Sequence, residues 1–336
     1  MSTLLLTKHR TVVRLVAALA VGIMFAAYED YFGKTRAIPS DLTQPWLAAR
    51  LLMEGRNPYR EIGPDGPVRH QFHLIYPVTA AVAVMPLTQL SLRAANAVFV
   101  GLGAGVLFWA LTRETFSNPS LLVFASLTMI VTANTVQWSP FLTSAVFLPS
   151  LGFLYACKPS VGIAYLVAYP NPRSWIGAAV FTLLTVVVWP WWPQDWLHQL
   201  PTVTHMSAPV ARWGGPLLLL ALLRWRRPEA RLLLALSCVP QTSVLYEAVP
   251  LFLVVRRIEE GAILLLLTYL FPPILQTAAG KPYDEWMTFS GEWMVWLLYI
   301  PCLIFVLRRP NLAPANDAVA ALSRWVSTRW MRSSAR

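Results

Sequence analysis

The chain has 336 residues, of which 56% are hydrophobic and only 13% are charged, and its formal net charge is +11. A soluble domain carries about 25% charged residues, and several apolar runs here approach the roughly 20 residues that cross a bilayer. The composition excludes an ordinary soluble domain and predicts an all-α polytopic membrane protein.

The first apolar run, at about residues 11–28, predicts a membrane span whose basic N-terminus lies in the cytoplasm. Residues 29–73 follow as an outer loop that contains a short helical pattern. Pro45 fits the first turn of this helix and Gly55 fits its C-terminal cap. We therefore expect an amphipathic helix on the outer membrane face, with Asp41 just before its start.

Apolar segments continue to about residue 308, and many of them are short or contain proline. Such segments are typical of broken helices or hairpins around an internal cavity, where irregular backbone is tolerated. If successive apolar segments cross the membrane in alternating directions, the sequence contains about twelve transmembrane or broken helices in a single domain, residues 1–308. Residues 309–336 are interpreted as a basic, amphipathic cytoplasmic tail on an anionic leaflet.

Basic residues gather at the ends of apolar segments, and aromatic-rich solvated loops are missing. The clusters are residues 8–14, 173, 224–231, 256–257, 308–309 and the C-terminal tail. Cytoplasmic ends of membrane helices carry such clusters. The charge is therefore interpreted as a topology signal with both termini cytoplasmic, and we expect membrane lipids, not nucleic acid, as partners.

Several polar and charged residues lie within or beside the apolar segments, and all of them fall on the side of the membrane assigned as outer. Those singled out are Asp41, His70, His73, Lys158, His198, Gln241, Tyr246 and Glu247. Charged groups inside or beside spans are costly and usually functional. Their convergence on one face predicts a polar cavity that opens outward above apolar helices.

Three of these positions leave alternatives open. Lys158, in "ACKPS", has no acidic neighbour in the local sequence, so its ammonium either reaches the interface or binds an anion such as a lipid phosphate. Asp41 is either a helix N-cap or a free carboxylate that accepts a proton. His70 and His73 would share one helix face, but no third ligand is evident, so no metal site is expected.

The order of several weak motifs carries a resemblance. "SD" and "AARLLMEGRNPY" are followed by "YPVTAAVAVMPLTQLSLRAANAVF", "TVQWSPF", "KPS", "DWLHQLPTV" and "VPQTSVLYEAVPLF". Over about residues 30–255 this resembles the GT-C type integral-membrane glycosyltransferases, in particular the polyprenol-phosphate-mannose-dependent α-mannosyltransferases. The chain departs from that group in having Val136 and Trp138 around Gln137.

The resemblance implies an inner (plasma) membrane enzyme that moves a sugar, expected to be mannose, from a polyprenyl-phosphate carrier to a lipid or glycan acceptor on the periplasmic or exterior face. It needs no cofactor or metal. Asp41 would be the general base and Lys158 would hold the donor phosphate. The implied sugar and acceptor pocket comprises His70, His73, Tyr76, Gln137, His198, Gln241, Tyr246 and Glu247.

Two other classes remain open. A transporter or flippase of lipid-linked sugars would also use Lys158 to bind phosphate. Such proteins often show internal repeats and paired intramembrane charges, and neither is visible in the sequence. A non-catalytic membrane partner would tolerate substitution of Asp41.

Overall fold

The computed structural model describes residues 2–36, 38–202 and 206–312, and this part of the chain is almost entirely helical. The α-helices are α1 (Ser2–Phe32), α2 (Thr43–Met53), α3 (Pro58–Glu61), α4 (Val78–Val84), α5 (Leu92–Leu111), α6 (Leu127–Thr135), α7 (Ser139–Ala145), α8 (Pro159–Ala168), α9 (Pro172–Val188), α10 (Trp192–Gln199), α11 (Pro228–Cys238), α12 (Ile258–Gln276), α13 (Tyr283–Met294) and α14 (Ile300–Leu307). Of the predicted cytoplasmic tail, residues 309–336, only residues 309–312 are described.

Short 3₁₀ and π segments connect these helices. The 3₁₀ segments are η1 (Gly33–Thr35), η2 (Met85–Gln89), η3 (Pro119–Ala125), η4 (Pro149–Cys157), η5 (Leu200–Thr202), η6 (Pro209–Ala211), η7 (Gly215–Arg224) and η8 (Leu245–Leu253), and η9 (Val295–Tyr299) is a π-helix. Two short parallel strands, β1 (Ile62–Gly63) and β2 (Val68–Arg69), pair within the first loop.

Four helical stretches are long and apolar enough to cross a membrane. They are Arg10–Thr35, Leu92–Leu111, Ile258–Gln276 and Tyr283–Leu307, and the pair Pro172–Val188 and Trp192–Thr202, bent by 105°, would make a fifth. The predicted twelve passes are not confirmed among the described residues. Many of the remaining apolar runs are split into pieces of ten residues or fewer, such as η4, α8, η7 and η8, because proline at a helix start or interior removes a backbone donor.

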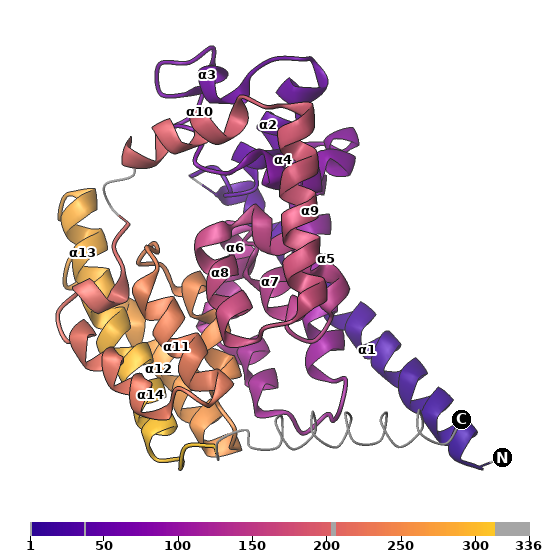
Figure 1. Ribbon diagram of the computed structural model, residues 1–336, viewed down its shortest axis with the longest axis vertical. Helices are drawn as coiled ribbons and strands as arrows, with labels where there is room; N and C mark the ends of the chain where they lie inside the picture. Colours follow the sequence, from indigo (N-terminus) through magenta and orange to yellow (C-terminus); the bar gives the residue numbers. More distant parts are fainter. Residues whose placement is uncertain (1, 37, 203–205, 313–336) are drawn as a thin grey trace, which may run out of the picture.

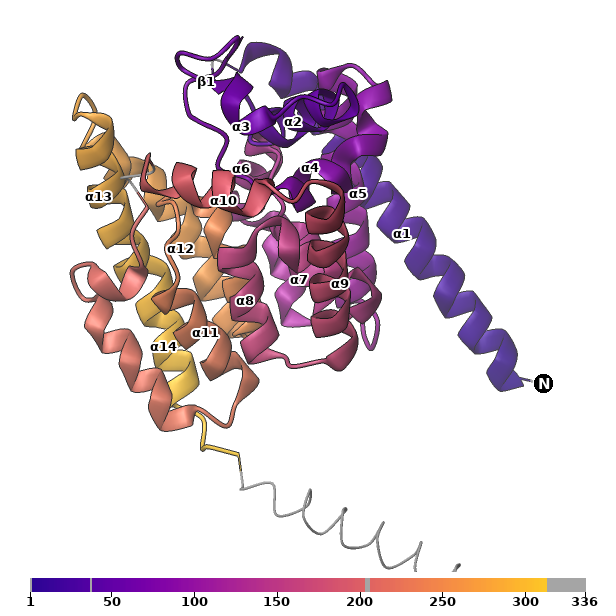
Figure 2. The same cartoon turned by 45° about the horizontal axis from the view of Figure 1, so that its top comes forward.

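The helices form two neighbouring groups (Figure 1). Helices α5 to α9 make up one group and α11 to α14 the other, while α10 runs across one end between them. Figure 2 shows the same crossing from a tilted view, and α1 leaves the first group at an angle in both views. Helices α2 and α3 lie at the end of the molecule that α10 crosses.

The helix of the first outer loop has the predicted bounds but is more buried than a helix lying on a membrane surface. Pro45 lies in the first turn of α2, and Gly55 follows its end with φ +71°, a conformation that glycine adopts without strain. Trp46 and Leu51 are buried, whereas Arg50 is exposed. α2 is therefore a packed part of the protein that supports the loop carrying Asp41.

Three of the basic clusters, at residues 224–231, 256–257 and 308–309, meet at the end of the molecule away from α10 (Figure 1). Arg231 on α11 donates to the carbonyl of Ala168 at the end of α8, at 3.0 Å, and Arg227 donates to the carbonyl of Pro310 at 2.6 Å. Glu229, only 1% exposed, lies 3.1 Å from Arg227 and 3.3 Å from Arg309. The segments that the sequence assigns to one membrane side are thus joined at one end of the fold.

Candidate functional site

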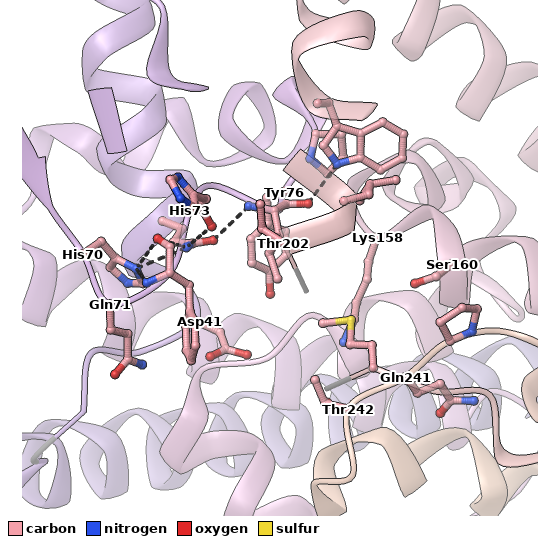
Figure 3. Close-up of a pocket in the computed structure, with 18 of the residues that line it drawn as sticks. Asp41, His70, Gln71, His73, Tyr76, Lys158, Ser160, Thr202, Gln241 and Thr242 are labelled. Atoms are coloured by element: carbon pink, nitrogen blue, oxygen red, sulfur yellow. Dashed lines mark hydrogen bonds between the residues drawn. The ribbon is translucent and has the colours of Figure 1, made fainter. Parts of the chain in front are cut away.

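A pocket of about 670 Å³ lies between the first loop, α10 and the C-terminal group of helices. Its polar lining includes Ser40, Asp41, Gln44, His70, His73, Tyr76, Lys158, Ser160, Gln241, Thr242, Tyr246 and Glu247, and its apolar and aromatic lining includes Phe72, Trp196, Leu200, Met206 and Tyr283. In Figure 3 the side chains of Asp41 and Lys158 project into the same space. The pocket thus combines a charged floor with an apolar, aromatic rim.

Asp41 is held in place by its backbone and by a neighbouring amide. Its N–H donates to the carbonyl of Thr135 at 3.0 Å, and the side chain of Gln137 donates to its Oδ2. The N-cap of α2 is Leu42, and no side chain caps this helix. The carboxylate of Asp41 is therefore not used as a helix cap and faces the pocket.

Burial gives this carboxylate a pKa suited to proton transfer. Desolvation raises the pKa of Asp41 from the ordinary value near 4 to about 6, although the nearby Lys158 and the hydrogen bond from Gln137 oppose the rise. At pH 7 the group is mostly ionised, yet it is more basic than an exposed aspartate. It can accept a proton from a hydroxyl brought into the pocket.

Lys158 lies at the junction of η4 and α8 and has a protein partner that local sequence does not indicate. Its Nζ is 2.8 Å from Oε1 of Glu247, a residue 89 positions away, and 3.5 Å from Oε1 of Gln137. The ammonium also lies 5.0 Å from the ring centroid of Tyr246. Neither sequence alternative for Lys158, an interfacial ammonium or one paired with lipid phosphate alone, describes this buried pair.

The turn that carries Lys158 depends on a close backbone approach at Gly162. The Gly162 N–H donates to the Lys158 carbonyl at 2.8 Å, and a Cβ at this glycine would lie 2.2 Å from the carbonyl oxygen of Tyr155. Gly162→Ala is therefore expected to lower the free energy of unfolding by about 1–3 kcal/mol, because η4 and α8 must move apart. Thermal unfolding in detergent measures the loss.

Gly177→Ala is the matched control for this prediction. A Cβ at Gly177 would lie 3.3 Å from its nearest neighbour, the backbone nitrogen of Phe153. We expect its thermal midpoint to stay close to that of the wild type. A Gly162→Ala midpoint equal to that of the wild type would show that the approach at Gly162 is not tight.

Gln137 lies behind the pocket wall and links two of its charged residues, Asp41 and Lys158. It is 3% exposed and contacts both Asp41 and Lys158 without lining the pocket. The residue before it, Val136, has φ +58°, a left-handed conformation that is strained for a β-branched side chain. The chain turns sharply at Val136, and this turn brings Gln137 between the two groups.

Residues 241–247 form the wall opposite the first loop. Thr242 Oγ1 lies 2.7 Å from the hydroxyl of Tyr246 and 3.2 Å from Oε1 of Glu247. Gln241 accepts from the hydroxyl of Tyr299 at 3.1 Å. These contacts hold the carboxylate of Glu247 against Lys158.

His70 and His73 line the pocket, but they lie in an irregular loop and not on one helix face as predicted. The preceding "GPDGP" breaks any helix, since proline and glycine disfavour the helix interior. Gln44 on α2 fixes this loop by donating to the carbonyls of His73 at 2.9 Å and Phe72 at 3.2 Å. Tyr76, at the end of the loop, also lines the pocket, as expected.

His198 was expected in the pocket and is placed outside it. It lies exposed on α10, whereas Trp196 and Leu200, four residues apart, line the pocket. Residues four apart share a helix face, and the residue midway between them points elsewhere. The expectation for His198 was therefore wrong.

Gln44, Trp196 and Thr242 are among the polar and aromatic lining residues that the sequence did not assign to the site. Gln44 lies in the first turn of α2, three positions after Asp41, and both line the pocket. Trp196 donates through Nε1 to the carbonyl of Ile75 at 2.9 Å, which joins α10 to the first loop. Nothing in the sequence around Thr242 indicated that it would line the pocket.

Within residues 2–36, 38–202 and 206–312, no three His, Cys, Asp or Glu side chains form a metal-binding group.

Comparisons with protein-family models, with curated proteins and with solved structures find no match to this chain. The pocket is therefore the feature from which a function can be inferred.

Proposed function

We propose that the protein is a membrane glycosyltransferase that moves a sugar, expected to be mannose, from a polyprenyl-phosphate carrier to a hydroxyl of a lipid or glycan acceptor. The observation that carries the proposal is the presence of a carboxylate with a raised pKa, Asp41, and an ammonium, Lys158, on one pocket in a protein built of apolar helices. The transfer requires one base and one cation.

The chemistry follows from these two groups. The acceptor oxygen attacks the anomeric carbon, its proton passes to Asp41, and the bond from that carbon to the phosphate oxygen breaks with its electrons remaining on the phosphate. A positioned base and a cation at the leaving group both lower the barrier of such a step. Hydrogen bonds from Gln137 to Oδ2 and from Tyr246 orient the carboxylate of Asp41 in the pocket.

The rim and the charge distribution support the assignment to lipid-linked substrates. Phe72, Trp196 and Tyr283 give the pocket an aromatic rim suited to an isoprenoid chain or to a sugar face. The basic clusters lie at the end of the fold opposite the pocket. By the positive-inside rule this supports a pocket on the non-cytoplasmic face of the inner membrane, with the N-terminus in the cytoplasm.

The test is transfer by the purified protein. Radiolabelled polyprenyl-phosphate-mannose is incubated with the protein and a lipid extract of its host, and labelled products are separated by chromatography. We expect a labelled lipid product from the wild type and from His198→Gln, which changes a residue outside the pocket. Carrier binding without transfer, together with carrier translocation in proteoliposomes, would instead support the flippase.

The pH dependence of transfer provides a separate check on Asp41. Because its pKa is raised to about 6, the base is ionised above that pH and protonated below it. The single-turnover rate should be level above pH 7 and should fall about tenfold for each pH unit below 6. A rate that is unchanged between pH 5 and pH 7 would contradict a role for this carboxylate.

A further inference from the structure

The lysine proposed to bind the donor phosphate is already paired with a carboxylate. Glu247 is 2% exposed, and its Oε1 lies 2.8 Å from the ammonium of Lys158, which is 14% exposed. The second oxygen of Glu247 is buried and has no hydrogen-bond partner among the described residues. An incoming phosphate therefore has to share Lys158 with this carboxylate or displace it.

The charges on the pocket wall sum to less than zero. In the described part of the chain, the acidic and basic side chains that line it are Asp41, Lys158 and Glu247, two carboxylates and one ammonium. With both carboxylates ionised, the wall carries a net charge of minus one before any ligand binds. The side chains of Glu247 and Lys158 are mostly buried, so their charges are screened less than charges on the surface.

We infer that Glu247 makes the pocket selective for a singly charged phosphodiester over a doubly charged phosphomonoester, so that it favours the donor and expels the spent carrier. This inference rests on the proposed function, because that function makes the diester the substrate and the monoester the product. Like charges brought together in a binding site discriminate against the wrong ligand.

Charge accounting through the reaction shows how the discrimination arises. The donor diester carries one negative charge, so the filled pocket has a net charge of minus two. Transfer converts the diester to a monoester with two negative charges and moves one proton from the acceptor to Asp41, so the sum is unchanged. When Asp41 releases that proton to water, the sum becomes minus three, and the repulsion from Glu247 acts directly on the phosphate at Lys158.

The experiment measures binding, not transfer. Short-chain polyprenyl phosphate and polyprenyl-phosphate-mannose are titrated by calorimetry into detergent-solubilised protein at pH 8, where the monoester carries two charges. We expect the wild type to bind the diester about tenfold more tightly than the monoester. In Glu247→Gln the monoester should gain about tenfold in affinity, and the preference should disappear.

Asp195→Asn is the matched control. Asp195 lies on α10, accepts from Asn57 at 2.6 Å and does not line the pocket, so its neutralisation changes the net charge of the protein by the same amount. It should keep the tenfold preference. Thermal midpoints of both variants confirm that each is folded.

Two outcomes would overturn the inference: an equal preference in the wild type and Glu247→Gln, or tighter binding of the monoester by the wild type. Failure of the proposed function would look different. In that case no sugar would be transferred by the wild type, whatever the ratio of the two affinities. Transfer with an unchanged ratio would reject only the role of Glu247.

Discussion

Replacing Asp41 with asparagine is expected to lower the single-turnover rate of sugar transfer by about a thousandfold, within the range that a general base contributes. The substitution keeps the size of the side chain and an oxygen that accepts from Gln137, so the loop before α2 keeps its shape. Binding of the donor should therefore persist. Rates are measured with enzyme in excess over labelled donor, and donor binding is measured by calorimetry.

Asp41→Glu is the informative companion variant, because it keeps a base but displaces it by one methylene. It should retain more activity than Asp41→Asn. If Asp41→Asn transfers sugar at the wild-type rate, the base lies elsewhere in the pocket, and Glu247 becomes the next candidate. Loss of donor binding in Asp41→Asn would indicate a structural role for this residue.

Replacing Glu229 with alanine is expected to lower the free energy of unfolding by about 3 kcal/mol or more. Its carboxylate is 1% exposed and lies within 3.5 Å of Arg227, Arg256 and Arg309. Removing one partner from a buried ion-pair network leaves uncompensated charge in a poorly hydrated place. Thermal or denaturant-induced unfolding in detergent measures the change.

Glu259→Ala serves as the control for that measurement. Glu259 is 62% exposed and makes an ion pair with Arg257 at 3.3 Å. Exposed pairs of this kind contribute about 0–1 kcal/mol. A comparable loss in the two variants would mean that the network around Glu229 is solvated and contributes little.

The helical class and the bounds of the first-loop helix followed from local pattern. Apolar runs identified the helices, and Pro45 and Gly55 marked the two ends of α2. The number of membrane spans could not be predicted in the same way, because hydropathy does not show where a proline-containing apolar run breaks into separate short helices. Segments such as η8, with Pro250 in its interior, are apolar enough for a span but too short for one.

The sequence predicted in part which residues come together in the pocket. Alternation of spans placed Asp41, Lys158 and Glu247 on one side, and the structure places all three on one pocket. The pairing of Lys158 with Glu247 was not predictable, because contacts between residues so far apart depend on how helices pack. The error at His198 has a simpler cause, since helical phase relative to Trp196 and Leu200 decides which side chain faces inward.

The network around Glu229 also has a mechanical consequence. It ties the first turn of α12, through Glu260 and Arg309, to the ends of α11 and α14. α12 has 19 residues, so it is roughly 28 Å long. A tilt of about 5° at this fixed end would carry the far end through roughly 2.5 Å.

That far end is joined to α13, whose first residue is Tyr283, by the turn at residues 277–282, in which Gly280 has φ +85°. The ring of Tyr283 lies 6.2 Å, centroid to centroid, from that of Phe72 across the pocket rim. α12 is therefore anchored at one end by the arginine cluster, and its other end is connected through residues 277–282 to the part of the pocket rim that carries Tyr283.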